Sequence, residues 1–246
     1  MSYQDKIVVV TGGSSGIGFG IAEHFVALGA RVVIVGRRQQ ALDEAVITIG
    51  GNIAAINADT SNLDELEAMY RDIASTYGRI DVLVANAGVG DLAPMGAITE
   101  AHFDRIFDTN VKGVTFTVQG ALPLMPPGAS VVIIGSTASM DPGPGLSVYG
   151  ASKAALRNLV RSWIQEIKPS GVRINLVSPG PVDTPSLRNM FTDNVEETLG
   201  FLRGRSMVGR IGTTADIAHA VAFVAGSDAG YINGIELFVD GGASQI

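Results

Sequence analysis

The 246-residue sequence contains no cysteine and only three histidines. Without thiols the chain can form no disulfide framework, and it has no thiolate for nucleophilic or redox chemistry. His24, His102 and His219 are scattered among segments with helical patterns. Three dispersed imidazoles without a cysteine partner are more typical of ordinary helix side chains than of ligands, and we expect no metal.

Charge is also sparse. Charged residues make up 17% of the chain, and the formal net charge is −7. No basic run suggests nucleic acid or an anionic membrane surface. The apolar runs are far shorter than the roughly 20 residues of a membrane span, and residues 1–6 have no signal-peptide core. We therefore expect a cytoplasmic protein without nucleic-acid or membrane partners.

What the sequence does have is hydrophobic content, 46% of its residues. This amount permits a sizeable core and excludes a disordered chain. The length suits one large α/β domain, and no linker, repeat or low-complexity tract interrupts residues 1–246. We expect a single dinucleotide-binding and catalytic domain.

Continuous apolar runs, which are typical of strands buried on both faces, alternate with helical patterns. The expected strands are 6–11, 31–35, 52–57, 80–85, 130–135, 172–177 and 235–239. The expected helices include 62–77, 100–122, a long helix from about 149, and 213–225. This alternation predicts an α/β fold with a doubly wound, parallel, seven-stranded sheet and helices on both faces.

A glycine-rich turn joins the first strand to the first helix with the spacing Gly-x-x-x-Gly-x-Gly. Any glycine turn can make such a connection. Here a second strand follows at βαβ distance, which favours a dinucleotide pyrophosphate held by close backbone and a helix N-terminus. The candidate residues are Gly12, Ser14, Ser15, Gly16, Ile17 and Gly18.

The second strand ends without an acidic residue, at Gly36, and Arg37 and Arg38 follow. A carboxylate at this point would bind the adenosine ribose hydroxyls, whereas an arginine can pair with a 2′-phosphate. The alternative is that both arginines only solvate a helix start. The pattern favours NADP(H) over NAD(H).

The ends of the next two strands give further cofactor candidates. Asp59, followed by Thr60, either accepts from the adenine amino group or caps the next helix, a role for which Ser61 competes. Asn86, Ala87 and Gly88 form a small-residue loop that suits a backbone packed against a flat ligand.

Three further positions are candidates for acid–base chemistry. Tyr149 and Lys153 lie four residues apart, on one face of a helix, where an ammonium would lower the pKa of the phenol. The Tyr-x-x-x-Lys pattern is common by chance and gains weight only from its context. Ser136 follows the fifth strand, at the sheet edge where ligands bind. Asn110, inside the 100–122 helix, is either an exposed polar residue or the mark of a kink holding a water.

The loop after the sixth strand contains Pro179, Gly180, Val182 and Thr184, and Thr184 could hydrogen-bond a carboxamide. Residues 186–207 are expected to form one or two short helices that act as a substrate-binding lid. The candidate pocket walls are Met140, Leu146, Val182, Met190 and Phe191, around Ser136 and Tyr149. These walls favour an apolar, uncharged substrate.

Taken together, the chain resembles the short-chain dehydrogenase/reductase family over its whole length. The matching motifs are Thr11-Gly12-x-x-x-Gly16-Ile17-Gly18, Asn86-Ala87-Gly88, Asn110, Ser136, Tyr149-x-x-x-Lys153, Pro179-Gly180 and Val239-Asp240-Gly241-Gly242. Within the family it looks most similar to bacterial NADP-dependent secondary-alcohol dehydrogenases and ketone reductases. The resemblance implies a Rossmann-type fold and a homotetramer.

The resemblance also implies a role for each site residue. Tyr149 exchanges the proton with the substrate oxygen, and Lys153 lowers the Tyr149 pKa and holds the nicotinamide ribose. Ser136 hydrogen-bonds the substrate oxygen, and Asn110 anchors a water between Lys153 and solvent. Thr184 and the backbone of Val182 hold the carboxamide.

The sequence thus predicts an NADP(H)-dependent oxidoreductase acting on ketones or secondary alcohols. One alternative is a 3-oxoacyl-[acyl-carrier-protein] reductase, which would need a basic docking patch. The arginines that could form it are Arg157, Arg161, Arg203, Arg205 and Arg210. The other alternative is a non-catalytic dinucleotide sensor, which would have no need of all four catalytic candidates.

Overall fold

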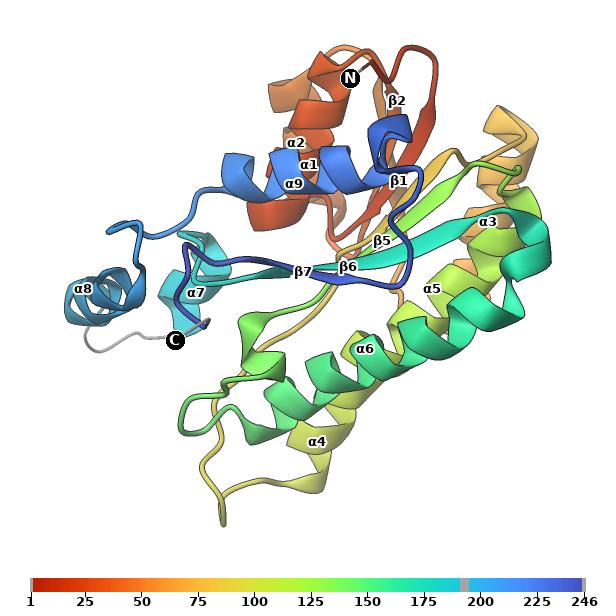
Figure 1. Cartoon of the computed structure of the whole chain (residues 1–246). Helices are drawn as coiled ribbons and strands as arrows, with labels where there is room; N and C mark the ends of the chain where they lie inside the picture. Colours follow the sequence, from red (N-terminus) through yellow and green to blue (C-terminus); the bar gives the residue numbers. More distant parts are fainter. Residues whose placement is uncertain (1, 191–194, 245–246) are drawn as a thin grey trace.

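The computed structural model describes residues 2–190 and 195–244. Seven parallel strands form one sheet in the order β3-β2-β1-β4-β5-β6-β7 (Figure 1). The strands are β1 (Ile7–Thr11), β2 (Arg31–Gly36), β3 (Ile53–Asn57), β4 (Val82–Ala85), β5 (Ser130–Ile134), β6 (Arg173–Pro179) and β7 (Glu236–Val239). The doubly wound parallel sheet is confirmed. β6 runs two residues beyond the predicted end, because Val239 pairs with Pro179.

Helices cover both faces of the sheet (Figure 1). Their bounds are α1 (Gly16–Ala27), α2 (Gln39–Ile49), α3 (Leu63–Tyr77), α4 (Glu100–Phe107), α5 (Val114–Ala121), α6 (Ser147–Glu166), α7 (Pro185–Met190), α8 (Val195–Arg205) and α9 (Thr214–Ala225). Side chains alternate along a strand, so Val8 and Val10 pack on one face, with α1 and α9. Val9 packs on the other, with α3, α5 and α6.

The order of the strands reverses direction between β1 and β4, which are neighbours although residues 12–81 separate them in the chain. In a doubly wound sheet this reversal opens a crevice beyond the carboxyl ends of the two strands. The glycine turn follows β1, and Asn86-Ala87-Gly88 follows β4. The fold therefore brings these two motifs to one place.

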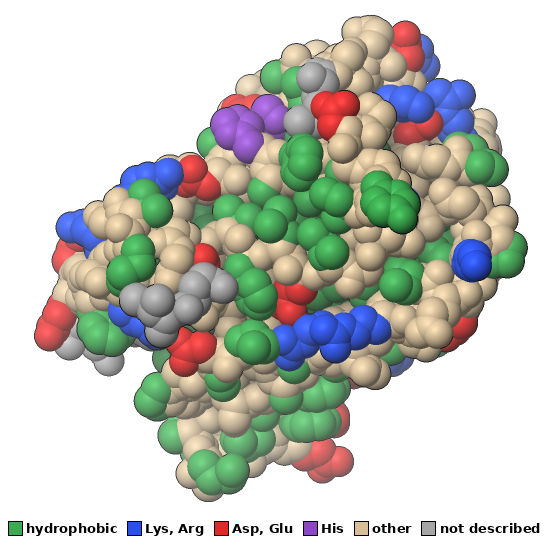
Figure 2. Space-filling view, in the orientation of Figure 1, with side chains coloured by type: hydrophobic (Ala, Val, Ile, Leu, Met, Phe, Trp, Pro, Cys, Tyr) green, Lys and Arg blue, Asp and Glu red, His purple; other side chains and the backbone are tan. Residues whose placement is uncertain are grey.

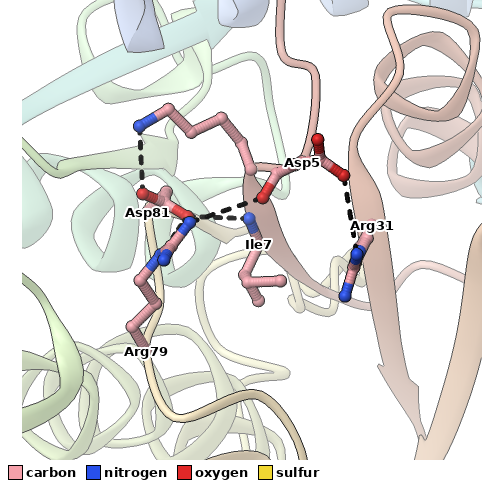
Figure 3. Close-up of polar contacts among 6 residues, drawn as sticks. Asp5, Ile7, Arg31, Arg79 and Asp81 are labelled. Carbon is pink, nitrogen blue, oxygen red and sulfur yellow. Dashed lines mark hydrogen bonds and ion pairs between the residues drawn. The ribbon is translucent and has the colours of Figure 1, made fainter.

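At the amino ends of the strands, away from the crevice, one buried carboxylate links the starts of the two central strands β1 and β4 (Figure 3). Asp81 accepts from the backbone N–H of Ile7 at 2.9 Å and pairs with Lys6 at 3.1 Å and Arg79 at 3.0 Å. Although burial opposes it, the pKa of Asp81 is lowered by the Ile7 hydrogen bond and the two cations.

Two local predictions need correction. The cap of α3 is neither Asp59 nor Ser61 but Asn62, whose side-chain oxygen accepts from the N–H groups of Asp64 and Glu65. The predicted 100–122 helix is interrupted by a π-helical stretch, Asp108–Gly113, which contains Asn110. A π-helical insertion widens the turn, and the kink considered for Asn110 is therefore present.

The described part of residues 186–207 lies mostly in two helices, α7 and α8, at the carboxyl side of the sheet (Figure 1). Two short helices agree with the prediction. In residues 2–190 and 195–244, no helix is both long and apolar enough to cross a membrane.

Candidate active site

A cavity of about 630 Å³ opens beyond the carboxyl ends of the strands. Most of the predicted site residues line it. They are Gly12, Ser14, Ser15, Gly16, Ile17, Gly18, Arg37, Arg38, Asp59, Thr60, Asn86, Ala87, Gly88, Ser136, Leu146, Tyr149, Lys153, Pro179, Gly180, Val182, Thr184 and Met190. The crevice at the strand-order reversal and the candidate catalytic residues thus share one cavity.

The glycine turn has a conformation that few other residues could adopt. Gly12 and Gly16 have φ values of 65° and 55°, in the left-handed region. A Cβ on Gly18 would lie 2.2 Å from the Gly12 carbonyl oxygen. Ser15 precedes α1 without capping it, so its side chain leaves the first-turn N–H groups available for an anion.

Asn86 locks this turn to the end of β4. Its amide donates to the carbonyl oxygens of Thr11, at 2.9 Å, and Gly12, at 3.2 Å. The Thr11 hydroxyl in turn accepts from the N–H groups of Asn86 and Ala87. These contacts fix the two strand ends relative to each other, and so they fix the floor of the crevice.

At the end of β2, the Arg37 guanidinium lies 3.5 Å from one carboxylate oxygen of Asp59. The other oxygen of Asp59 accepts from the backbone and hydroxyl of Ser61. Burial opposes ionisation, but the Ser61 hydrogen bonds and Arg37 together lower the pKa of Asp59. The site therefore presents an ionised acceptor beside an exposed cation, and Arg38 follows at the start of α2.

The acid–base candidates meet where α6 passes the end of β5. Tyr149 lies in the first turn of α6 and Lys153 one turn later. The Lys153 ammonium donates to the Ile134 carbonyl oxygen at 2.9 Å and lies 5.9 Å from the centroid of the Tyr149 ring. Ser136 hydrogen-bonds Tyr149 and accepts from the Ala138 N–H.

The pKa values of Tyr149 and Lys153 are shifted in opposite directions. Burial raises the pKa of Tyr149, and the hydrogen bond from Ser136 opposes this effect only in part. Burial lowers the pKa of Lys153 to about 8. Desolvation of the phenolate thus outweighs the Ser136 hydrogen bond, and a lowering of the Tyr149 pKa by Lys153 stays a prediction.

Asn110 lies behind the cavity rather than in it, and it is fully buried. Its side-chain oxygen accepts from the Val89 N–H at 2.8 Å, and its amide donates to Val89 O and Ser152 Oγ. Ser152 donates to the Tyr149 carbonyl oxygen. Asn110 thereby joins the loop after β4 to the start of α6, and the water implied by the resemblance stays a prediction.

The loop after β6 closes over the glycine turn. The Thr184 methyl carbon lies 3.5 Å from where a Cβ on Gly16 would be, and the Thr184 hydroxyl accepts from the Leu187 N–H at the start of α7. Val182 pairs with Gly212 in an isolated bridge.

The predicted pocket walls divide into three groups. Leu146, Val182 and Met190 line the cavity. Met140 does not, because its side chain is 59% exposed and its sulfur contacts Arg157. Phe191 lies outside the described residues.

The apolar wall residues that the sequence prediction missed include Leu92, Leu187, Phe201 and Leu202. Three of these belong to the segment expected to form the lid. Their hydrophobicity was a signal, but only the packing of α7 and α8 assigns them to the cavity.

Comparisons with known proteins agree with this geometry. A family model described as "Enoyl-(Acyl carrier protein) reductase" matches residues 12–244. The oxidoreductase asL5 of Sarocladium schorii is 40% identical over 243 residues, 98% of this chain and 96% of that protein. A solved short-chain dehydrogenase from Burkholderia cenocepacia, in complex with NADP, has a TM-score of 0.90 and 32% identity, covering 99% of each chain. The chain belongs to the short-chain dehydrogenase/reductase family.

This short-chain dehydrogenase/reductase is also similar to the (S)-acetoin-forming diacetyl reductase of Staphylococcus aureus. The two are 34% identical over 251 residues, which covers 97% of both chains. As a member of the family, the protein is an oxidoreductase that uses a nicotinamide cofactor. The left-handed glycines Gly12 and Gly16 and the uncapped first turn of α1, together the glycine cradle, fit the pyrophosphate of such a dinucleotide. Within the described ranges, no group of three or more potential metal ligands comes together.

Proposed function

We propose that this protein is an NADP(H)-dependent oxidoreductase that reduces ketones or oxidises secondary alcohols of apolar character. The observation that carries the proposal is the shared cavity. It places Tyr149, Ser136 and Lys153 beyond β5 and the glycine cradle beyond β1, within one continuous space.

The chain's own residues then handle the proton. When bound, the reduced nicotinamide supplies a hydride to the carbonyl carbon, and negative charge grows on the carbonyl oxygen. The Tyr149 hydroxyl donates its proton to this oxygen, and Ser136 donates a hydrogen bond at the same point. Lys153, charged and fixed by Ile134, stabilises the tyrosinate that remains. In alcohol oxidation Tyr149 accepts the proton instead.

Three observations support NADP(H) over NAD(H). β2 ends at Gly36 with no carboxylate, and the exposed Arg37 lines the cavity beyond it. A guanidinium pairs well with the 2′-phosphate that distinguishes the two cofactors. The similar Burkholderia cenocepacia structure is a complex with NADP.

The walls near Tyr149 support an apolar substrate. Leu92, Leu146, Met190 and Phe201 line this part of the chain's cavity. A Cβ on Gly90 would lie 2.9 Å from the Met190 methyl carbon and 3.5 Å from the Tyr149 ring, so Met190 is next to the reacting group. A relative named as a diacetyl reductase makes a ketone a reasonable substrate class. We propose that residues 186–207, which supply Met190 and Phe201, act as the lid.

The carrier-protein alternative finds less support, although the matching family model carries an acyl-carrier name. Arg157 pairs with Glu236, Arg205 with Asp141 and Arg210 with Asp216. An arginine already paired with a carboxylate is a weaker docking site for an acidic partner. The complete set of Asn110, Ser136, Tyr149 and Lys153 disfavours the sensor alternative.

We also propose one domain and a homotetramer, and a cytoplasmic location stays a prediction. Large apolar side chains exposed on the described surface include Phe103 on α4, Phe223 on α9 and Tyr231. Figure 2 shows hydrophobic side chains gathered over the middle of one face, where β7 and α9 lie in Figure 1. Native mass spectrometry should give four times the 25.5-kDa chain mass.

The proposed reaction is tested by following NADPH and NADH consumption in parallel against ketones of graded bulk and polarity. We expect turnover of apolar ketones with a strong preference for NADPH. Tyr149→Phe should lose at least ~100-fold in kcat, the lower range for a proton donor, while still binding NADPH. A Tyr149→Phe variant with full turnover would refute the mechanism, whereas tight NADPH binding without turnover of any ketone would favour the two alternatives.

A further inference from the structure

A buried ion pair lies next to the catalytic serine but outside the cavity. The Glu236 carboxylate on β7 is only 7% exposed, and one of its oxygens lies 3.3 Å from the Arg157 guanidinium on α6. The other oxygen accepts from the hydroxyls of Ser178, at 2.7 Å, and Ser139, at 3.0 Å. A buried carboxylate with every partner in place is costly to disturb, so this cluster is rigid.

The cluster holds the turn that contains Ser136. Ser136 caps a short 3₁₀ turn, Thr137–Ser139, and Ser139 binds the cluster twice. Its hydroxyl donates to Glu236, and its carbonyl oxygen accepts from Arg157 at 3.3 Å. The far end of the turn is therefore fixed to both β7 and α6.

The near end of the same segment is fixed by the catalytic lysine. Lys153 donates to Ile134, and Arg157 lies four residues, about one helical turn, further along α6. Gly135 leaves room for the cluster, because a Cβ there would lie 2.2 Å from Ser178 Oγ. Ser136 thus lies between two residues that are held in place by hydrogen bonds, Ile134 and Ser139.

We propose that Glu236 and Arg157 are positioning residues, which hold the 137–139 turn so that the Ser136 hydroxyl faces Tyr149 and the substrate oxygen. This inference rests on the proposed function. Displacing a catalytic group by a fraction of an ångström to 1 Å can cost up to ~100-fold in rate, so the effect is expected in kcat.

The test combines Glu236→Gln with Ser136→Ala. Glutamine keeps the size of the side chain but removes its charge. With NADPH and the best ketone, Glu236→Gln should lower kcat about 10-fold and leave the KM for NADPH unchanged, since the pair lies away from the glycine cradle. In the Ser136→Ala background, the same substitution should cost less than about 2-fold, because the group that it positions is already absent. An equal loss in both backgrounds, or an unchanged kcat, would overturn the proposal.

A less disruptive variant and a matched control distinguish loss of positioning from loss of folding. Ser139→Ala removes one link while Glu236 keeps Ser178 and Arg157, and it should lower kcat about 3-fold with the same dependence on Ser136. Glu166→Gln removes an exposed carboxylate from α6, which contacts only Ser162 among the hydrogen bonds described, and should leave kcat unchanged.

Hydrogen exchange gives a readout that needs no activity. The Ala138 N–H donates to Ser136 Oγ, and Glu236→Gln should speed exchange in a 135–140 peptide but not in a 12–20 peptide. Should the unmodified protein turn over no ketone, the proposed function fails and exchange alone decides the positioning role. Unchanged exchange in the 135–140 peptide would refute it.

Discussion

Lys153, the lysine that we propose to be catalytic, is a buried cation whose charge depends on pH near neutrality. Burial lowers the Lys153 pKa to about 8, whereas the Tyr149 pKa is raised. Lys153 is therefore charged below about pH 8 and neutral above it, while Tyr149 keeps its proton throughout this range. We therefore expect any alkaline limb of the proposed reaction to reflect Lys153 and not Tyr149.

We therefore expect ketone reduction to slow as the pH rises through about 8, because neutral Lys153 no longer stabilises the tyrosinate. The profile of kcat/KM against pH measures this. Lys153→Met should lower the rate by about 100-fold or more and remove the limb. A rate that stays flat to pH 10 in the unmodified protein would contradict the assignment.

Arg37 should set the cofactor preference. Arg37→Gln removes the guanidinium beyond β2, and we expect the KM for NADPH to rise about 10-fold, as for one charge-assisted contact, with little change for NADH. Arg31→Gln, at the other end of the same strand and exposed, is the matched control. Equal effects on both cofactors would show that Arg37 does not read the 2′-phosphate.

How far the residues of the site were predictable depends on how local their signals are. The glycine turn and the Tyr149–Lys153 pair follow from spacing within one element, and the structure places them in the cavity. Met140 was misassigned because only the path of its loop turns it outward. The contact between Arg157 and Glu236 joins segments far apart in the chain, so no local sequence pattern predicts it.

Among the elements, the interrupted helix between β4 and β5 has the most direct bearing on the site. Its π-helical stretch turns the Asn110 side chain onto Val89 and Ser152. A regular helix would carry each residue after the insertion about 100° further round, so this register is specific to the widened turn.

Asn110→Ala should lower the free energy of unfolding by about 2 kcal/mol, because it removes three hydrogen bonds and leaves Val89 with unpaired groups. We expect kcat to fall as well, since the start of α6 loosens. Denaturant titration and steady-state kinetics measure the two effects. Asp108→Asn in the same stretch breaks only an exposed pair with Lys112 and should change stability by less than ~0.5 kcal/mol. Similar losses in both variants would mean that Asn110 has no special role.

The helices and strands were largely predictable from the sequence, but helix breaks and helix caps were not. Apolar runs predicted all seven strands, and most of these are runs of Val, Ile and Leu, the pattern that strands buried on both faces leave. The break in the 100–122 helix was foreshadowed only by a single asparagine. Neither of the two caps considered for α3, Asp59 and Ser61, is the one used. Several residues that can cap a helix follow one another before Leu63, and Asn62 takes the role.

For the whole molecule, Asp81 and its partners join the two halves of the sheet at the amino ends of β1 and β4, away from the cavity (Figure 3). Asp81→Asn should cost about 2 kcal/mol, the range for hydrogen bonds to a charged group. In a chain of this size this corresponds to a drop of roughly 4–8 °C in Tm. Asp5→Asn, which weakens an exposed pair with Arg31, is the control and should shift Tm by less than ~2 °C.

The same cluster predicts a pH dependence of stability. The folded-state pKa of Asp81 lies below its ordinary value, so the unfolded chain takes up the proton first. The contribution of Asp81 is fully present above about pH 5 and is lost as the pH falls through 4 and below. The stability gap between the unmodified protein and Asp81→Asn should therefore shrink in acid, and a gap that is constant from pH 7 to 3 would rule this out.

The order of the strands affects how coenzyme preference and substrate range can change independently in such a protein. Residues up to Thr60, ending on the β3 side of the sheet, supply Arg37, Asp59 and the glycine cradle, whereas the apolar walls come from the β4–β7 side. The residues that we propose to select the coenzyme and those that we propose to accept the ketone thus come largely from separate stretches of sequence. These stretches meet at the crevice between β1 and β4 and where the Thr184 loop covers Gly16. We therefore expect chimaeras that exchange residues 1–60 between relatives to take the coenzyme preference of one parent and the substrate range of the other.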